Sequence, residues 1–194
     1  YEYYLLSAEL SQKVDRCTID EMRIDGFTLM EIAGSSAAKE LLVTDDPLSH
    51  GVYLCGKGNN GGDALVIARY LIQHDIEATV VFLSGTENLA PDAARNLELL
   101  QNFNTANIVT IAESWDSFSP PDDFDFIIDG MLGTGLTSDV RGDYTNAVDW
   151  ANNQNQPVFS IDIPTGLHPN SGLIMGCAIQ ADRTFAFGGR KQGF

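Results

Sequence analysis

A glycine-rich turn between an apolar segment and a helical pattern constrains this chain more than any other feature. Residues 51–55 form an apolar run that predicts a buried strand, and four glycines follow within residues 56–62. Apolar residues then recur at helical spacing from Leu65 to Ile72. Strand, turn and helix in this order direct backbone N–H groups and a helix N-terminus at an anion. A tight connector without a ligand is the alternative, although the density of Gly, Asn and Asp favours a site.

The helix after this turn is expected over residues 62–74, with Asp63 as its cap. Asn59 and Asn60 precede it; both tolerate left-handed backbone angles and carry amide oxygens that can bind a ligand. The turn therefore offers both N–H donors and side-chain oxygens.

The rest of the chain alternates between strand and helix patterns. We expect strands over residues 51–55, 78–83, 107–112, 124–129, 157–163 and 184–187, and helices over residues 62–74, 91–103 and 144–152. Residues 1–45 read as helical, with one helix from Ser7 and another from Thr28, which forms a capping-box pattern with Glu31. The pattern predicts a three-layer αβα, Rossmann-like fold: a mostly parallel sheet with N-terminal helices. We expect one domain over residues 1–194, a fragment of a longer chain.

Composition excludes several classes of function. The formal net charge of −16 opposes binding to nucleic acid or an anionic membrane. An anionic ligand would therefore need local positive potential from N–H groups, a cation or an Arg. The three cysteines are far apart, which indicates a reducing, cytoplasmic location without a structural disulfide. The three histidines lack the spacing of a metal site, and the sequences of a P-loop and a serine-hydrolase elbow are absent.

Two further segments follow expected strands, at the edge where ligands bind in such folds. The first runs from Asp129 to Leu136 and the second from Ser160 to Leu167. A carboxylate at the end of a buried strand needs a cation or a backbone donor as its partner. The alternative for both Asp129 and Asp162 is a capping role in a turn. Arg141 is equally compatible with a phosphate contact and with a solvated position.

These segments resemble one family in order. The run Gly-x-Gly-Asn-Asn-Gly-Gly-Asp, from Gly56 to Asp63, resembles the signature of the YjeF N-terminal domain family, the NAD(P)HX epimerases. The two segments above resemble the family's later motifs, and residues 181–193 resemble its end, including Lys191-Gln192-Gly193. The chain departs from the family pattern at four positions, which are Ile32, Ala64, Gly130 and Thr165.

The resemblance implies an isomerase that interconverts the R and S forms of hydrated NADH and NADPH, for repair by a partner dehydratase. The hydrated carbon is a hemiaminal, so its inversion requires proton transfer, which a carboxylate can provide. We assign the acid–base or ring-contacting role to Asp162. The substrate-binding residues implied are Asn59, Asn60, Gly61, Gly62, Asp63, Gly133, Thr134, Gly135, Leu136, Thr137, Ser138, Asp139 and Asp162.

The resemblance also implies a bound potassium ion, with the side chains of Asn60, Asp129 and Thr165 as its ligands. All three offer hard oxygens, which an alkali cation prefers. The ion would supply positive potential that the net charge of −16 calls for. Two alternatives stay open: the epimerase half of a bifunctional epimerase/dehydratase, and a non-catalytic nucleotide- or protein-binding module of the same fold. A homodimer is a further expectation.

Overall fold

The apolar runs of the sequence form one six-stranded parallel sheet in the computed structural model, which describes residues 5–43, 48–103 and 108–194. Its order is β3-β2-β1-β4-β5-β6, and every pair of neighbours is parallel. The strands are β1 (His50–Cys55), β2 (Glu77–Phe82), β3 (Val109–Ala112), β4 (Phe126–Gly130), β5 (Val158–Ile161) and β6 (Arg183–Phe185). Each expected strand is confirmed to within two residues at its ends, except that residue 107 lies outside the described ranges.

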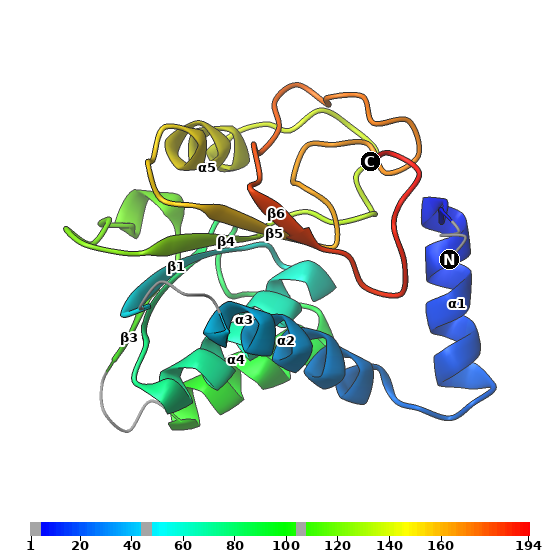
Figure 1. Ribbon diagram of the computed structural model, residues 1–194, viewed down its shortest axis with the longest axis horizontal. Helices are drawn as coiled ribbons and strands as arrows, with labels where there is room; N and C mark the ends of the chain where they lie inside the picture. The colour runs from blue at the N-terminus through cyan, green and yellow to red at the C-terminus, as the bar shows by residue number, and fades with distance from the viewer. Residues whose placement is uncertain (1–4, 44–47, 104–107) are drawn as a thin grey trace.

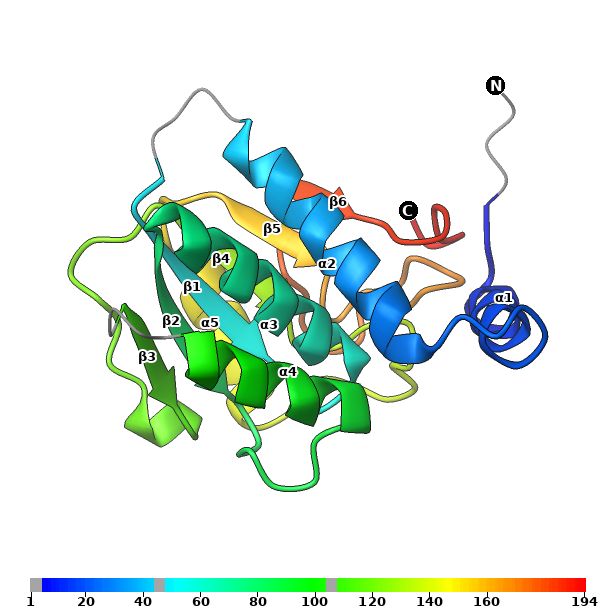
Figure 2. The ribbon, with the colours of Figure 1, turned by 90° about the horizontal axis from the view of Figure 1, so that it is seen from below.

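Helices cover both faces of this sheet, as the alternation predicts (Figure 1). On one face lie α2 (Gly26–Leu42), α3 (Asn59–Leu71) and α4 (Pro91–Phe103), seen in front of the strands in Figure 2. On the other face lies α5 (Asp143–Asn152). The described elements also include two short 3-10 turns, η1 (Ile72–His74) and η2 (Trp115–Ser117). The three-layer αβα prediction is confirmed.

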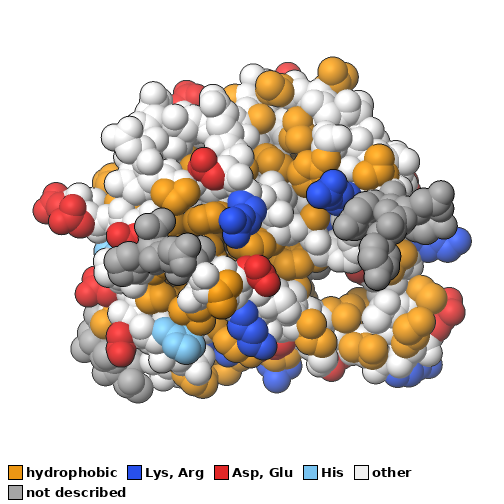
Figure 3. Space-filling model, in the orientation of Figure 1, with side chains coloured by type: hydrophobic (Ala, Val, Ile, Leu, Met, Phe, Trp, Pro, Cys, Tyr) orange, Lys and Arg blue, Asp and Glu red, His pale blue; other side chains and the backbone are white. Residues whose placement is uncertain are grey.

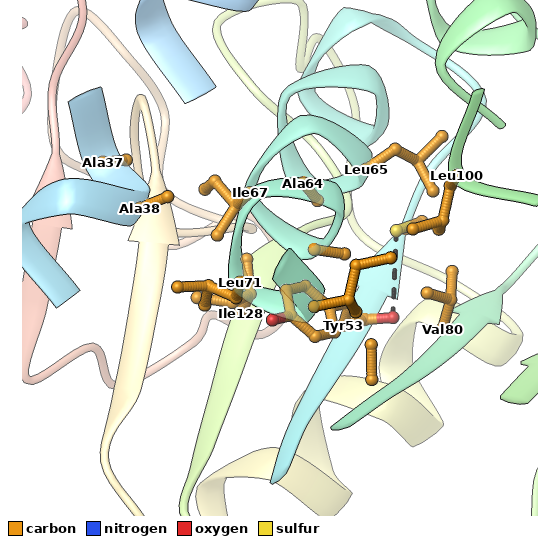
Figure 4. Close-up of a cluster of buried hydrophobic side chains, with 14 of the residues drawn as sticks. Ala37, Ala38, Tyr53, Ala64, Leu65, Ile67, Leu71, Val80, Leu100 and Ile128 are labelled. Carbon is orange, nitrogen blue, oxygen red and sulfur yellow. Dashed lines mark hydrogen bonds between the residues drawn. The ribbon is translucent and has the colours of Figure 1, made fainter. Parts of the chain in front are cut away.

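The larger core cluster lies between the sheet and the layer of α2, α3 and α4. Tyr53 of β1 is fully buried there, beneath apolar side chains of α3 (Figure 4). Its ring meets that of Phe126 edge-on, with centroids 5.9 Å apart. Cys55 lies in the same cluster, as the sequence predicts, and burial raises the pKa of its thiol well above the ordinary value. This cysteine is therefore a neutral packing group.

Two helix starts differ from the prediction. Helix α3 begins at Asn59, so Asp63 lies inside the helix and its assignment as a cap is wrong. Helix α2 begins at Gly26, because the carboxylate of Asp25 accepts a hydrogen bond from the Thr28 amide at 2.9 Å. The capping box predicted at Thr28 is therefore also wrong.

Helix α1 (Ala8–Asp20) stands beside the C-terminal segment rather than on the sheet (Figure 1). The helix predicted to start from Ser7 is confirmed, and Ser7 caps it by accepting a hydrogen bond from the Leu10 amide at 3.1 Å. In the space-filling view an opening separates part of α1 from the body of the molecule (Figure 3). Leu10 and Val14 are 45% and 44% exposed, so the apolar side of α1 is not packed on the sheet. None of the helices in the described ranges is long and apolar enough to cross a membrane.

Helices α2 and α3 pack closely because a glycine stands at their contact. A Cβ added at Gly34 would lie 2.5 Å from Cβ of Val66 and 3.1 Å from the carbonyl oxygen of Asp63. Nearby, the buried Arg69 of α3 forms an ion pair with Glu31 of α2. The contact at Gly34 therefore sets how near α2 approaches the first turns of α3.

We predict that Gly34→Ala lowers the free energy of unfolding by about 1–3 kcal/mol, because overpacking outweighs the gain in helix propensity. Urea unfolding measures this change. Gly135→Ala is the matched control: nothing lies within 4 Å of the added Cβ, and we expect a change within about 0.5 kcal/mol. Equal stability of the two variants would contradict the close contact.

Candidate active site

The three motif segments meet at the carboxyl edge of the sheet. They follow β1, β4 and β5, and β1 and β4 are the neighbours between which the strand order reverses. The amide of Gly56 donates to the carbonyl of Gly130 at 3.0 Å, which joins the ends of β1 and β4. This is the position at which open parallel sheets bind ligands.

The first segment can approach the second because its glycines have no side chain. A Cβ at Gly56 would lie 1.9 Å from the carbonyl oxygen of Met131, and one at Gly61 would lie 2.1 Å from that of Gly56. Gly58 is the N-cap of α3 and provides no side-chain hydrogen bond. The first amides of α3 are therefore without a side-chain cap, and the N-terminus of this helix favours an anion.

Asp129 is the most constrained group of the site. It is the penultimate residue of β4 and has no exposed surface. It accepts four hydrogen bonds: 2.7 Å from Ser160 Oγ, 2.8 Å from the Thr165 amide, 2.6 Å from Thr165 Oγ1 and 3.3 Å from the Met131 amide. Burial raises the pKa of this carboxyl, and the bonds from Thr165, Ser160 and Met131 oppose the shift. The sequence predicts a cation or a backbone donor as the partner of this acid. In the structure its partners are two backbone amides and two hydroxyl groups.

Oxygen atoms gather around Thr165. Its Oγ1 accepts from the Leu132 amide at 2.9 Å and lies 3.2 Å from the Leu132 carbonyl oxygen. A Cβ at Gly133 would lie 3.4 Å from Oδ1 of Asn60, which places the Asn60 amide against the same segment. The Nδ2 of Asn60 is buried without a hydrogen-bond partner among the described residues. The expected ligands Asn60, Asp129 and Thr165 thus lie around one short segment, residues 131–133.

The remainder of the second segment is more open. Gly135, Thr137, Ser138 and Asp139 are exposed, and Thr134 and Leu136 are half-buried. The segment is anchored at its end, where the Val140 amide donates to the carbonyl of Met175 at 2.9 Å. Substrate binding by residues 133–139, and by the exposed Asn59, stays a prediction.

Asp162 follows β5 in an unusual conformation. Its φ is +66°, in the left-handed region, and its amide donates to the carbonyl of Phe185 at 2.8 Å. Its carboxylate forms an ion pair with Lys191. Lys191 is fully buried and has no role in the sequence prediction, although it stands in the matched segment Lys191-Gln192-Gly193. The Lys-x-Gly pattern at the end of the last motif is the signal that could have identified it.

Two more carboxyl groups belong to this neighbourhood. Desolvation raises the pKa of Asp63 well above its ordinary value, and the charges of Asp162 and Asp15 raise it further. The pKa of Asp15 is also raised, by desolvation and by Asp162, whereas Lys191 lowers it. Asp15 lies on α1, which the sequence did not connect with the site. Its position near Asp162 arises from contacts between the two ends of the chain.

We predict that Asp63→Asn stabilises the protein more at pH 8 than at pH 4. The folded state binds the carboxyl proton more tightly than the unfolded state, so Asp63 costs stability as pH rises above about 4, by about 1.4 kcal/mol for each unit of the shift. Urea unfolding at the two pH values measures the difference. Substitution of the exposed Asp149 by Asn is the control. If Asp63→Asn changes the free energy of unfolding equally at both pH values, the prediction is contradicted.

Comparisons with known proteins identify the family of this chain. The family described as YjeF-related protein N-terminus matches residues 26–193. The bifunctional NAD(P)H-hydrate repair enzyme Nnr of Salinibacter ruber is 40% identical over 97% of this chain, which spans 37% of that protein's length. The NAD(P)H-hydrate epimerase of Rhodopirellula baltica is 32% identical over 97% of this chain, which spans 76% of its length.

A solved structure supports the fold. The yeast protein YNL200c superposes with a TM-score of 0.80 at 24% identity, over 98% of this chain and 82% of its own. The expected family is therefore confirmed by sequence, and its architecture by structure. The chain belongs to the family described as YjeF-related protein N-terminus.

Proposed function

We propose that this chain epimerises the R and S forms of hydrated NADH and NADPH at the hydrated nicotinamide carbon. The observation that carries the proposal is Asp162, a carboxylate held by a buried lysine at the carboxyl edge of a parallel sheet. Relatives named NAD(P)H-hydrate epimerase are 30–35% identical over most of the chain, which supports the same substrate class. The proposed enzyme is an isomerase.

Binding in this proposal uses the open end of α3. The pyrophosphate lies at the first turn, Asn59–Gly62, where amides without a side-chain cap and the helix dipole favour an anion. Residues 133–139 contact the sugars, since this segment lies beside Asn60 and is partly exposed. Both assignments agree with the close approach of the first two segments at Gly56.

Chemistry in this proposal is proton transfer by Asp162. Inversion of a hemiaminal carbon proceeds by loss and return of the hydroxyl, or by opening and closing of the ring. In ring opening, an ionised carboxylate takes the hydroxyl proton as the C–N bond breaks and passes it to the ring nitrogen; the reverse transfers then close the ring on the other face of the aldehyde. Loss of the hydroxyl as water instead requires a protonated acid that first gives its proton to the departing oxygen. Asp162 has 18% of its side-chain surface exposed, enough to meet a substrate. Asp63, whose pKa is raised, is a neighbouring carboxyl that holds its proton to higher pH than usual.

Potassium is part of the proposal, with Asn60, Asp129 and Thr165 as its ligands. The donor set fits a hard cation: a carboxylate, a hydroxyl and an amide, with the Leu132 carbonyl beside them. The Thr165 hydroxyl has one proton but faces both Asp129 and the Leu132 carbonyl, so one of these oxygens is left without it. Exchanging the two amide atoms of Asn60 would turn its oxygen to the place of the unpartnered Nδ2. When bound, the ion would supply positive charge near an anionic substrate.

Partners and location complete the proposal. We place the chain in the cytoplasm, with hydrated NADH or NADPH as its substrate and a dehydratase as its functional partner. The relative from Salinibacter ruber is named as bifunctional, which supports a fused dehydratase. We also propose a homodimer, for which the exposed Leu10, Val14 and Ile32 offer apolar surface. The net charge of −16 opposes nucleic acid and anionic membranes as partners.

The first experiment follows epimerisation of purified S- or R-NADHX by chromatography, in potassium buffer. We predict rapid equilibration by the wild type and a loss of about 10²–10⁴-fold in Asp162→Asn, because the amide cannot take up the proton. The exposed Asp149→Asn is the control and keeps full activity. A well-folded wild type without activity would instead favour the non-catalytic binding module.

The second experiment measures thermal unfolding in potassium and in sodium chloride at equal ionic strength. We predict that potassium stabilises the wild type by about 1–2 kcal/mol at ten times its dissociation constant or more. Asn60→Ala loses this difference, since it removes one ligand. The neighbouring Asn59→Ala keeps it, because Asn59 is exposed at the first turn of α3. Equal stability of the wild type in both salts would contradict the assigned ion.

A further inference from the structure

Lys191 is the one charged side chain of the described residues, apart from Asp129, that has no exposed surface at all. A lysine is rarely buried to this extent unless its ammonium group is fully paired. Here Nζ donates to the carbonyl oxygens of Phe187 at 2.7 Å and Gly189 at 3.1 Å, and it forms the ion pair with Asp162. An ammonium group has three N–H donors, so these three contacts use them all.

The three contacts connect the segment after β5 with the turn after β6. Asp162 is held through its backbone by Phe185 and through its carboxylate by Lys191. The left-handed φ of +66° at Asp162 is disfavoured for a residue with a side chain, so these contacts must hold it there. The direction in which this carboxylate points therefore depends on the ammonium group.

The backbone of Lys191 is itself fixed by the N-terminal segment. Leu6 forms a parallel bridge with Lys191: its amide donates to the Arg190 carbonyl at 2.7 Å, and its carbonyl accepts from the Gln192 amide at 3.0 Å. The chain then enters α1, which brings Asp15 toward the site. The carboxyl groups that interact with Asp162 are thus Asp15 and Asp63, and Lys191 is the cation that pairs with Asp162 and lowers the pKa of Asp15.

We propose that Lys191 is a positioning residue that fixes the Asp162 carboxylate for proton transfer. This inference rests on the proposed epimerase activity. The charge on Asp15, and that on Asp63 once it ionises, would repel the carboxylate of Asp162, and the ammonium group of Lys191 opposes this repulsion. With its three donors occupied, Lys191 acts through Asp162 rather than on the substrate. The competing explanation is that Lys191 only stabilises the turn at residues 187–189, through its hydrogen bonds to the carbonyl oxygens there.

Lys191→Met separates these two explanations. It keeps an unbranched side chain one atom shorter than lysine and removes the charge and the N–H donors. We expect kcat to fall by about 10²-fold while KM changes by less than about threefold, and the acid limb of the kcat/KM profile to move to higher pH. The exposed Lys39→Met is the matched control. An unchanged pH profile in a folded Lys191→Met protein, whatever its stability, would overturn the positioning role. Lys191→Gln, which keeps N–H donors, serves the same test if Lys191→Met does not fold.

A double-mutant cycle tests whether Lys191 acts through Asp162. In an Asp162→Asn background, Lys191→Met should cost less than about threefold further activity, because the group it positions is already lost. Losses that multiply would show that Lys191 acts on the substrate itself, and would overturn the proposal.

Hydrogen exchange makes the inference independent of the proposed reaction. If the wild type is inactive, the proposed epimerase activity is rejected, and hydrogen exchange still tests whether Lys191 holds Asp162 in place. Faster exchange of the Asp162 amide in Lys191→Met, with the amides of α3 unchanged, would support the holding of Asp162 by the ammonium group. Unchanged exchange at Asp162 would overturn it.

Discussion

The buried carboxylate of Asp129 is the constraint on which the site depends. A carboxylate without exposed surface is costly unless donors surround it, and Ser160, Met131 and Thr165 provide four hydrogen bonds. Those donors come from β5 and from the segments after β4 and β5. Satisfying one acid therefore fixes the end of two strands and the turn that carries Thr165. The same turn places Asp162, three residues earlier, at the rim of the site.

Glycines set the distances between the segments that form the site. At Gly56 and Gly61 a side chain would collide with backbone oxygens, and at Gly166 a Cβ would lie 1.9 Å from the carbonyl of Cys177. Gly166 also has a φ of +90°, a backbone conformation that residues with a side chain rarely adopt. The motif glycines thus serve two purposes: they permit backbone contact between segments, and they leave the first turn of α3 bare for a ligand.

The parts of the fold that local patterns determine were predictable from the sequence. Alternating apolar runs and helical spacing gave the parallel sheet and its two helical layers, and the rule for parallel sheets placed Asp129 and Asp162 at one edge. The start of α3 was missed because Asn and Gly have low helix propensity, and packing against α2 overrides it. Lys191 and Asp15 were missed because their roles come from pairing between the two ends of the chain, which no local pattern encodes.

Electrostatics explains why the ends of the chain matter. The molecule carries a net charge of −16, and three carboxyl groups, on α1, on α3 and after β5, interact at the site. An anionic substrate adds to this repulsion. The raised pKa of Asp63 relieves part of it by retaining a proton, and Lys191 relieves part by its charge. The parallel bridge at Leu6 joins the N-terminal segment to the backbone of Lys191. This segment continues into α1, which carries Asp15. The same contact therefore brings a carboxyl group toward the site and fixes the backbone of the lysine that interacts with it. The acid–base balance of the site is therefore set by tertiary contacts outside the motifs that define the family.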